Sequence, residues 1–339
     1  MPETPFPPRA VVLLALGTPR DAGVPAVRRF LREFLSDRRV VALPWILRKA
    51  LVELVILPRR AAVAAARYRK IETPRGMPLA VFTEALRERV RAALGNRVPV
   101  FAAMRYGEPS AESVAREIAR LGVREVAVLP QFPQYAESSF ETAVAHFSDA
   151  LKRFAPRARA RVAAPFYTAT GYVEAVAETL RGFVGEGRDF LFSFHGVPVK
   201  SLVRVARGKR LACNPARAEF SEKNCVACAA AEKCYRRQCF AGAAAIAAAA
   251  GIPRERFRVA FQSRFGGGAW LLPATADEKI SDATVVVAPG FTADNLETLL
   301  ELRELGAGTL APCLNDSPRF AEFLAREAES LFAGEDAQT

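Results

Sequence analysis

Eight short apolar runs recur along the chain, and most are followed by a longer amphipathic segment. The runs are continuous rather than alternating, which is typical of strands buried on both faces of a parallel sheet. The segments between them, such as "FTEALRERVRAALG" (82–95), have apolar residues at helical spacing and often end in glycine. The runs occupy residues 10–17, 98–104, 124–131, 160–165, 189–196, 257–263, 284–290 and 308–313. This pattern predicts an α/β fold of repeated β–α units.

Eight β–α units form either one closed barrel or two four-stranded doubly wound sheets, and periodicity alone does not choose between them. A length of 339 residues suits one large domain or two of ordinary size. Four of the runs end in similar glycine and proline punctuation, "LGTP", "LPQFP", "FHGVP" and "APGF". Because open α/β sheets bind ligands outside the carboxyl ends of their strands, we expect the chemistry at these tips.

The charge of the chain limits its partners. There are 48 basic and 36 acidic residues, but the arginines are scattered rather than grouped in runs. This favours an arginine-rich surface over a nucleic-acid-binding face, and leaves an anionic small molecule or an acidic membrane surface as alternatives. The N-terminus is polar and proline-rich, unlike a secretory signal, and no uncharged run has the length of a membrane span. We therefore expect a cytoplasmic protein, with peripheral membrane association as an option, whose cysteines stay reduced.

One of the two histidines lies at a predicted strand tip. His195 ends the run "DFLFSFHG", and the following Gly196 lets the backbone turn and leaves the imidazole accessible. An imidazole with a near-neutral pKa suits proton transfer, and a structural role is the equal alternative. His146 lies instead on a helical pattern, where surface exposure or packing explains it.

Three carboxylates follow another strand tip, in "VVVAPGFTADNLETLLEL". Glu297 and Glu301 are four residues apart and share one helix face, and Asp294 lies three residues before Glu297. We expect Thr292 or Asp294 to cap this helix. Such carboxylates can hold a hard cation or relay protons, whereas the plain alternative is an acidic helix N-terminus favoured by the macrodipole.

Eight segments, taken together, resemble the ferrochelatases, which insert Fe(II) into a porphyrin to form haem. In chain order they are "ALGTP" (15–19), "VRRFLREFLSD" (27–37), "AMRYGEPS" (103–110), "LPQFPQY" (129–135), "FSFHGVP" (192–198), "FQSRFG" (261–266), "APGFTADNLETL" (288–299) and "CLNDSP" (313–318). The resemblance covers nearly the whole chain. It implies two Rossmann-like domains with a porphyrin cleft between them, rather than a barrel. The expected domains are 1–165 completed by 308–339, and 166–307 carrying an insert at 209–234.

The resemblance also implies the site residues. His195 matches the active-site histidine that accepts pyrrole protons or binds incoming iron, and Glu297 matches the carboxylate that faces it. Glu301 and Asp294 continue an acidic path for the substrate Fe(II). Other residues fall in segments that match the porphyrin cleft, with core packing or ion pairing as the alternative for each. They are Met77, Met104, Arg105, Tyr106, Phe132, Tyr135 and Arg264.

Residues 43–70, "LPWILRKALVELVILPRRAAVAAARYRK", are apolar with basic residues at both ends. We call them the lip segment, because the resemblance implies a lip over the porphyrin. Such a segment could touch an anionic membrane surface, and an ordinary core helix is the alternative.

Five of the six cysteines lie between residues 211 and 239. Four of them fall in the insert that the resemblance identifies: Cys213, Cys225, Cys228 and Cys234. Four thiols suffice for zinc or for an iron–sulfur cluster, and their spacing does not separate the two. Several ferrochelatases carry a [2Fe–2S] cluster, so the resemblance favours that cofactor, with structural zinc as the alternative. Cys239 occupies a position where relatives carry cysteine without a cluster, and it is the alternative ligand to Cys213.

Two rival functions share this fold. One is a cobalt or nickel chelatase of the same superfamily, against which the "FQSRFG" and "DNLETL" segments argue. The other is a non-catalytic haem or metal carrier, against which the presence of both His195 and Glu297 argues. We therefore predict an iron-inserting porphyrin chelatase that uses porphyrin and ferrous iron and does not bind nucleic acid.

Overall fold

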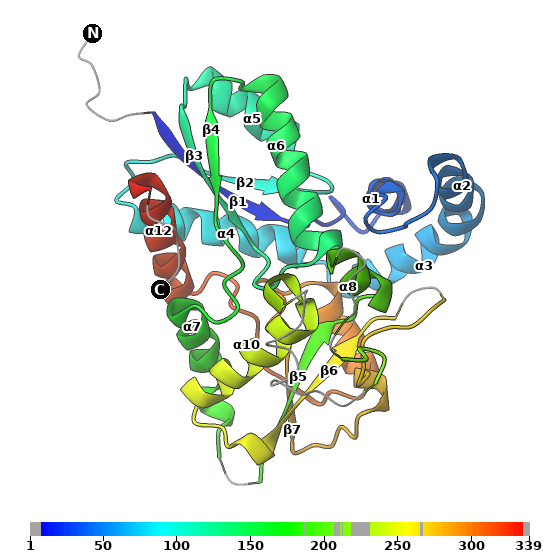
Figure 1. Ribbon diagram of the computed structural model, residues 1–339. Coiled ribbons are helices and arrows are strands. Elements are labelled where there is room, and N and C mark those ends of the chain that lie inside the picture. The colour runs from blue at the N-terminus through cyan, green and yellow to red at the C-terminus, as the bar shows by residue number, and fades with distance from the viewer. Residues whose placement is uncertain are drawn as a thin grey trace.

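The chain forms two four-stranded parallel sheets flanked by helices (Figure 1). The structure, a computed structural model, describes residues 8–185, 187–206, 211, 213–217, 231–264 and 267–334. The first sheet contains β1 (Arg9–Ala15), β2 (Val100–Met104), β3 (Glu125–Pro130) and β4 (Arg159–Val162). The second contains β5 (Asp189–His195), β6 (Phe257–Gln262), β7 (Thr284–Val287) and β8 (Thr309–Leu310). All eight predicted strands are confirmed.

The two sheets have the same topology. Their strand orders are β2-β1-β3-β4 and β6-β5-β7-β8, and every pairing is parallel. In each sheet, the first strand in sequence is an inner strand and the second pairs with it at one edge. The third pairs with the other side of the first strand, and the fourth forms the opposite edge. The described strands therefore form two doubly wound sheets, and the barrel alternative is wrong.

Strand β1 is buried on both faces, as its continuous apolar sequence predicts. Val12 and Leu14 pack in one core cluster with residues of the helices on one face, whereas Val11 and Leu13 belong to the cluster on the other. The helices are α1 (Val24–Ser36), α4 (Pro78–Ala93), α5 (Ala111–Arg120), α6 (Thr142–Phe154), α7 (Thr170–Leu180), α8 (Val199–Val205), α10 (Tyr235–Ala249), α11 (Leu302–Glu304) and α12 (Pro318–Ala333), with shorter helical turns η2 (Glu137–Glu141), η3 (Arg181–Phe183), η4 (Ala231–Lys233), η5 (Arg254–Arg256), η6 (Thr275–Asp277) and η7 (Glu297–Glu301).

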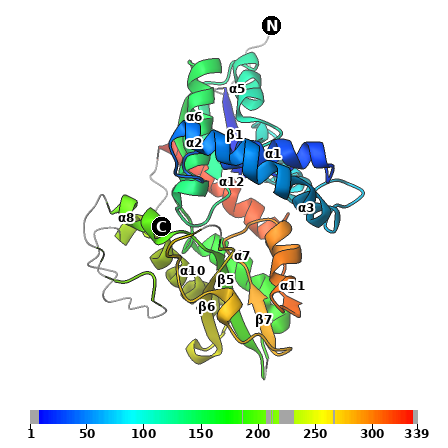
Figure 2. The same ribbon diagram turned by 90° about the vertical axis from the view of Figure 1, so that its right-hand side faces the viewer.

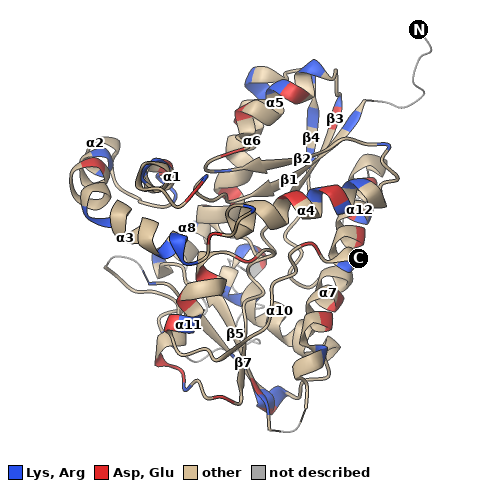
Figure 3. Ribbon diagram, turned by 180° about the vertical axis from the view of Figure 1, so that it is seen from behind, with Lys and Arg blue, Asp and Glu red and all other residues tan. Residues whose placement is uncertain are grey.

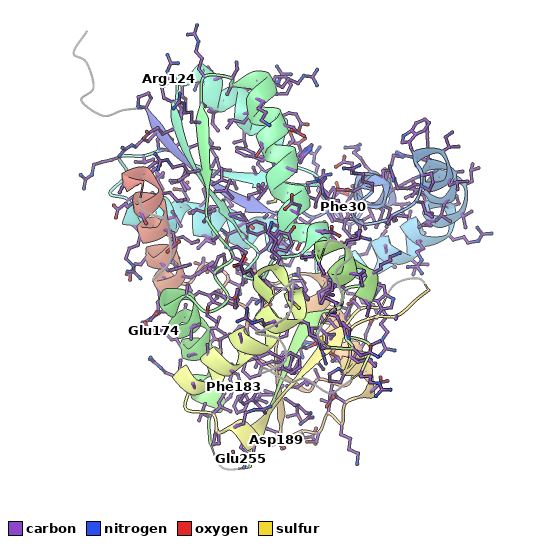
Figure 4. All side chains as sticks on the ribbon, in the orientation of Figure 1. Phe30, Arg124, Glu174, Phe183, Asp189 and Glu255 are labelled. Carbon is purple, nitrogen blue, oxygen red and sulfur yellow. The ribbon has the colours of Figure 1, made fainter. Side chains whose placement is uncertain are left out.

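The two sheets point their strand tips at each other. Figure 4 labels Arg124, just before β3, and Asp189, the first residue of β5, at opposite ends of the molecule, so both strands run toward the middle. The tips also touch: the Thr292 hydroxyl, after β7, donates to the Gln131 carbonyl, after β3, at 3.5 Å. Residues that follow the strands of both sheets are thus brought together.

The C-terminal helix α12 connects the two halves. It packs against α4 and β3 of the first half and also against α7, which precedes the second sheet. One core cluster accordingly contains residues next to both sheets, such as Leu13 and Phe192. The predicted domain boundaries at 165 and 307 therefore stay predictions.

The lip segment forms three consecutive helical stretches: α2 (Trp45–Ala50), the π-helical η1 (Leu51–Ile56) and α3 (Leu57–Arg69). Figure 2 shows them beside α1, outside the first sheet, and α1 contacts α3. One side is anchored, because Val52, Leu57 and Leu35 form a small core. The other side exposes large apolar side chains, so the core-helix alternative accounts for only part of the segment. No helix in the described ranges has the length and apolarity needed to cross a membrane.

Candidate active site

His195 lies at the tip of β5, as its sequence position predicts. Side chains alternate along this strand, so Phe194 enters the core while Ser193 and His195 share the opposite face. The Gly196 amide donates to the Gln262 carbonyl at 2.7 Å. A Cβ at position 196 would lie only 2.7 Å from that carbonyl oxygen, which explains the glycine. The backbone beside the imidazole is thus fixed by the neighbouring strand.

Burial lowers the pKa of His195, and the negative charge of Glu301 acts in the opposite direction. The imidazole is therefore neutral at pH 7 and has a lone pair available to accept a proton. It keeps partial solvent exposure, and its ring meets the edge of Phe291 at a centroid distance of 6.4 Å. An accessible neutral imidazole beside an aromatic ring suits proton transfer from a flat apolar molecule.

Glu297 opens η7, a π-helical turn that follows the tip of β7. Such turns are rare and often occur at functional sites. Burial, together with the negative charge of Glu301, raises the pKa of Glu297 to about 7. Glu297 therefore exchanges its proton near neutral pH, unlike an ordinary surface carboxylate.

The cap of this turn is Asn295, not Thr292 or Asp294 as the sequence suggested. The Asn295 side-chain oxygen accepts the backbone N–H groups of Glu297 and Thr298 at 3.0 and 3.1 Å. The Thr292 hydroxyl is used instead for the contact with the β3 tip. Asparagine is among the preferred capping residues, so the signal was present in the sequence.

Asp294 is buried and occupied by neighbouring side chains. Its carboxylate accepts the Thr298 hydroxyl at 2.9 Å and the Asn315 amide at 2.8 Å, and its own backbone N–H donates back to Asn315 at 2.8 Å. These bonds hold the β7 tip against the segment before α12. In the present arrangement Asp294 acts as a structural link.

Glu301 is held between two elements. One carboxylate oxygen accepts from Arg67 of the lip segment at 3.0 Å, and the other accepts from the Ser263 hydroxyl at 3.0 Å. Arg67 also pairs with Glu304. Arg67 was not among the predicted site residues, because in the sequence it is one of several basic residues at the ends of the apolar lip segment.

The predicted iron path does not form a ready-made metal centre. Among the described residues, no three His, Cys, Asp or Glu side chains lie close enough together to hold one metal ion. This agrees with the separate partners of Asp294 and Glu301.

Two of the predicted porphyrin contacts form a buried network with Asp37. Arg105 donates to the Asp37 carboxylate at 2.6 Å and to the Thr142 hydroxyl at 3.0 Å, and the Tyr106 hydroxyl donates to Asp37 at 3.0 Å. Tyr106 is fully buried, and Met77 is 1% exposed in the same aromatic cluster as Phe30. In this structure Arg105 and Tyr106 are therefore engaged with Asp37, and Met77 is packed in a core cluster.

The remaining predicted contacts differ in exposure. Met104, the last residue of β2, is buried, and Tyr135 is nearly buried, with its hydroxyl donated to Glu141 at 3.0 Å. Phe132 is partly exposed after the β3 tip. Arg264 is exposed and pairs with Asp277 at 3.2 Å. Phe132 and Arg264 are thus the two predicted contacts that solvent reaches most readily.

A surface hollow of about 670 Å³ lies elsewhere, beside the edge strand β2. It is lined by residues of α4 and α5, including Arg87, Arg91 and Glu117, and contains neither His195 nor Glu297. Arg87 and Arg91 already pair with Glu88. We therefore place the site at the strand tips.

The described cysteines fall into two environments. Cys213 is partly exposed, and Cys234 is buried directly before α10. Cys239 is fully buried inside α10, where burial raises the pKa of its thiol well above the usual range and Tyr235 forms a hydrogen bond with it. The predicted ligands Cys225 and Cys228 lie outside the described residues.

Two doubly wound sheets meet tip to tip, with a neutral imidazole on one strand and a carboxylate of pKa about 7 after another. This arrangement is typical of an α/β enzyme that binds its ligand at the strand tips. The family model of ferrochelatase matches residues 8–330. A ferrochelatase of Opitutus terrae is 38% identical over 343 residues, which span 96% of this chain and 98% of that protein. A ferrochelatase of Pseudomonas putida is 36% identical over 343 residues, which span 94% and 98%, and one of Bdellovibrio bacteriovorus is 35% identical over 343 residues, which span 95% and 99%. The chain belongs to the ferrochelatase family.

Proposed function

We propose that this protein inserts Fe(II) into protoporphyrin IX, or a related porphyrin, and releases two protons. The observation that carries the proposal is the pair of proton acceptors at the facing strand tips. His195 is neutral at pH 7, and Glu297 has a pKa of about 7. Membership of the ferrochelatase family supports the same reaction.

Metallation of a porphyrin requires the removal of two pyrrole protons and the delivery of a metal that has lost most of its water. His195 accepts a pyrrole proton, because its lowered pKa keeps its lone pair free. Glu297 takes up and releases a proton near pH 7, so it can pass protons toward solvent. Glu301 offers a carboxylate to the substrate Fe(II), which tolerates imidazole and carboxylate ligands. Asp294 continues this path only if Asn315 releases it.

The porphyrin contacts divide into two roles in this proposal. Phe132 offers an apolar surface to the macrocycle, and the exposed Arg264 offers a cation to a propionate. Tyr135, Met104 and the buried group of Met77, Arg105 and Tyr106 shape the wall behind that contact surface.

The rival chelatase function is tested by substrate choice. Purified protein is supplied with Fe(II), Co(II) or Ni(II), and with either a dicarboxylic porphyrin or an octacarboxylic tetrapyrrole of the same ring size. We expect rapid metallation of the dicarboxylic porphyrin with Fe(II), because the site residues include apolar groups and few cations. Preference for the octacarboxylic ring would favour the cobalt or nickel chelatase, and binding without metallation would favour the carrier.

We infer that the insert holds a [2Fe–2S] cluster through Cys213, Cys225, Cys228 and Cys234. The described ends of the insert fit such a group. Arg236 donates to the Arg217 carbonyl at 2.9 Å, and the Leu272 amide donates to the Pro215 carbonyl at 3.3 Å. The segment of Cys213 is thereby tied to the first turn of α10, which Cys234 precedes. When bound, a cluster supplies one-electron chemistry and crosslinks the insert.

The cluster proposal predicts a brown protein with about two irons per chain. Replacing Cys213 by Ser should remove the visible absorption bands and lower the thermal midpoint, because metal binding organises the insert. Replacing Cys239 by Ser is the matched control and should leave the colour intact, since the resemblance already accounts for a cysteine at this position without a cluster. Colour that survives in the Cys213 variant and vanishes in the Cys239 variant would exchange these two ligands, and a colourless protein with one zinc would favour the structural metal.

We also propose that the lip segment makes a peripheral contact with anionic membranes. Ile46 and Leu54 are 70% and 73% exposed, and Trp45 is 65% exposed beside Lys49. Figure 3 shows these helices as mainly uncharged ribbon interrupted by basic positions and by the acidic Glu53 of η1. An apolar surface with basic residues binds lipid interfaces through both its buried area and its charge.

Replacing Ile46 and Leu54 together by Ser should weaken binding to vesicles that contain anionic phospholipid by at least about tenfold, since burying each such side chain contributes roughly 1.5–3 kcal/mol. Vesicle sedimentation measures this. Leu121→Ser is the matched control, because Leu121 is an exposed leucine on a distant helix end. Equal vesicle binding by the double variant and the wild type would exclude the lip as the contact surface.

A further inference from the structure

Arg67 bridges the two halves of the molecule at the site. It lies near the end of α3 in the lip, and its guanidinium reaches two carboxylates that lie between β7 and β8 of the second sheet. One nitrogen lies 3.0 Å from Glu301 and another 2.5 Å from Glu304. The side chains of Arg67 and Glu301 are 31% and 25% exposed, so water screens this pair less than an ordinary surface pair.

The carboxylate of Glu301 is already engaged on both sides. Arg67 donates to one oxygen, and the Ser263 hydroxyl donates to the other. A divalent cation that binds both oxygens of Glu301 therefore competes with a guanidinium, which stays protonated and repels the incoming cation. The same guanidinium also pairs with Glu304, so one side chain occupies both carboxylates.

We infer that Arg67 is a positioning residue that gates the carboxylates of Glu301 and Glu304, holding them as an ion pair until a divalent cation displaces its guanidinium. The inference rests on the proposed iron-inserting function, and it adds a specific residue that controls access to the metal path. Arg67 does not itself need to touch porphyrin or iron.

The next residue, Tyr68, packs this part of the lip against an aromatic core cluster. Tyr68 is 9% exposed and packs edge-on against Phe30. It belongs to the aromatic cluster that also contains Met77. Arg67 is therefore anchored by its packed neighbour Tyr68. The same helix exposes apolar side chains earlier in its sequence, such as Val63. A displacement of α3 would carry the guanidinium away from both carboxylates.

Binding of Mn(II) to the porphyrin-free protein tests the gate, because Mn(II) prefers carboxylate oxygen and free Mn(II) is measured by its electron paramagnetic resonance signal. Arg67→Gln should lower the Kd for Mn(II) by at least about tenfold, since it removes the competing cation. Adding Glu301→Gln to that variant should abolish the gain. Arg69→Gln is the matched control, because Arg69 is an exposed arginine on the same helix, and it should bind Mn(II) as the wild type does.

A folded Arg67→Gln protein with the wild-type Kd for Mn(II) would overturn the gate, and so would a gain that persists after Glu301→Gln. If Arg67→Gln does not fold, Arg67→Lys replaces it. Lysine keeps the charge but loses the fork that spans two carboxylates, so a smaller gain in Mn(II) affinity is expected, and no gain would overturn the inference. Haem formation by the wild type is measured separately, so a protein that gates Mn(II) but makes no haem would reject the proposed function alone.

Discussion

Replacement of His195 by Ala is expected to lower kcat for porphyrin metallation by at least about a hundredfold, which is the contribution typical of a general base. The loss should fall on turnover, because the neutral imidazole accepts a pyrrole proton rather than holding the macrocycle in place. Porphyrin binding, followed by quenching of porphyrin fluorescence, should change by no more than about twofold, the spread expected where no binding contact is removed.

The other histidine provides a matched control. His146 lies on α6 near Glu112, with 3.6 Å between the imidazole and the carboxylate. His146→Ala should therefore keep the wild-type kcat. Near-wild-type turnover of His195→Ala would mean that His195 has a structural role, and loss of porphyrin binding in that variant would mean that it acts as a contact instead.

Glu297→Gln is expected to be nearly as damaging as His195→Ala, whereas Glu301→Gln should be less so. Glutamine keeps the size of Glu297 but cannot exchange a proton near pH 7. Glu301 lies farther along the acidic path and is already held by Arg67 and Ser263. If Glu301→Gln lowered kcat more than Glu297→Gln does, the reacting centre would lie nearer to Glu301.

The pH dependence gives this variant a second readout. Glu297 has a pKa of about 7, and the pKa of His195 is lowered, so both acceptors are unprotonated only above about pH 7. The metallation rate of the wild type should therefore rise as the pH increases through 7 and level off above it. In Glu297→Gln, the part of this rise that occurs near pH 7 should disappear.

As the pH rises through 7, the stability of the fold should fall while the metallation rate rises. Because the pKa of Glu297 is raised in the folded state, the fold holds this proton more tightly than the unfolded chain does. The resulting stabilisation is present at low pH and is lost as the pH rises through about 7, where a partly buried negative charge forms. Glu297→Gln should thus raise the thermal midpoint at pH 8 more than at pH 5. A midpoint that falls equally at both values would assign Glu297 a structural role.

The strands and the position of His195 could be predicted because both depend on local patterns. A continuous apolar run identifies a strand of a parallel sheet, and a polar residue at its end lies where such sheets bind ligands. The choice between a barrel and two sheets could not be made this way, since it depends on which strands pair. The observed order β6-β5-β7-β8 is a tertiary property.

The details of the acidic turn depended on partners that are distant in sequence. Asp294 was predicted as a cap or a metal ligand, but its carboxylate accepts a hydrogen bond from Asn315. The Thr292 hydroxyl donates to the carbonyl of Gln131 instead of capping the turn. The residue left to cap the turn was Asn295. The pairing of Arg67 with Glu301 joins residues 234 positions apart, and no local pattern reports such a contact.

The predicted porphyrin contacts show the same limit. Tyr106 and Phe132 both lie just beyond strands, and both were predicted as porphyrin contacts. Tyr106 is fully buried because Asp37, at the end of α1, accepts its hydroxyl, whereas Phe132 keeps solvent access. Burial at a strand tip depends on what the rest of the chain places over it.

The most direct test of the account is the rate of haem formation under anaerobic conditions, with Fe(II), protoporphyrin IX and purified protein, followed by the change from the free-porphyrin to the haem absorption spectrum. Wild-type protein should form haem with many turnovers per chain, and the variant that carries both His195→Ala and Glu297→Gln should be at or near the uncatalysed rate. Haem formation by the wild type no faster than in the absence of protein would contradict the account, and so would a double variant as active as the wild type.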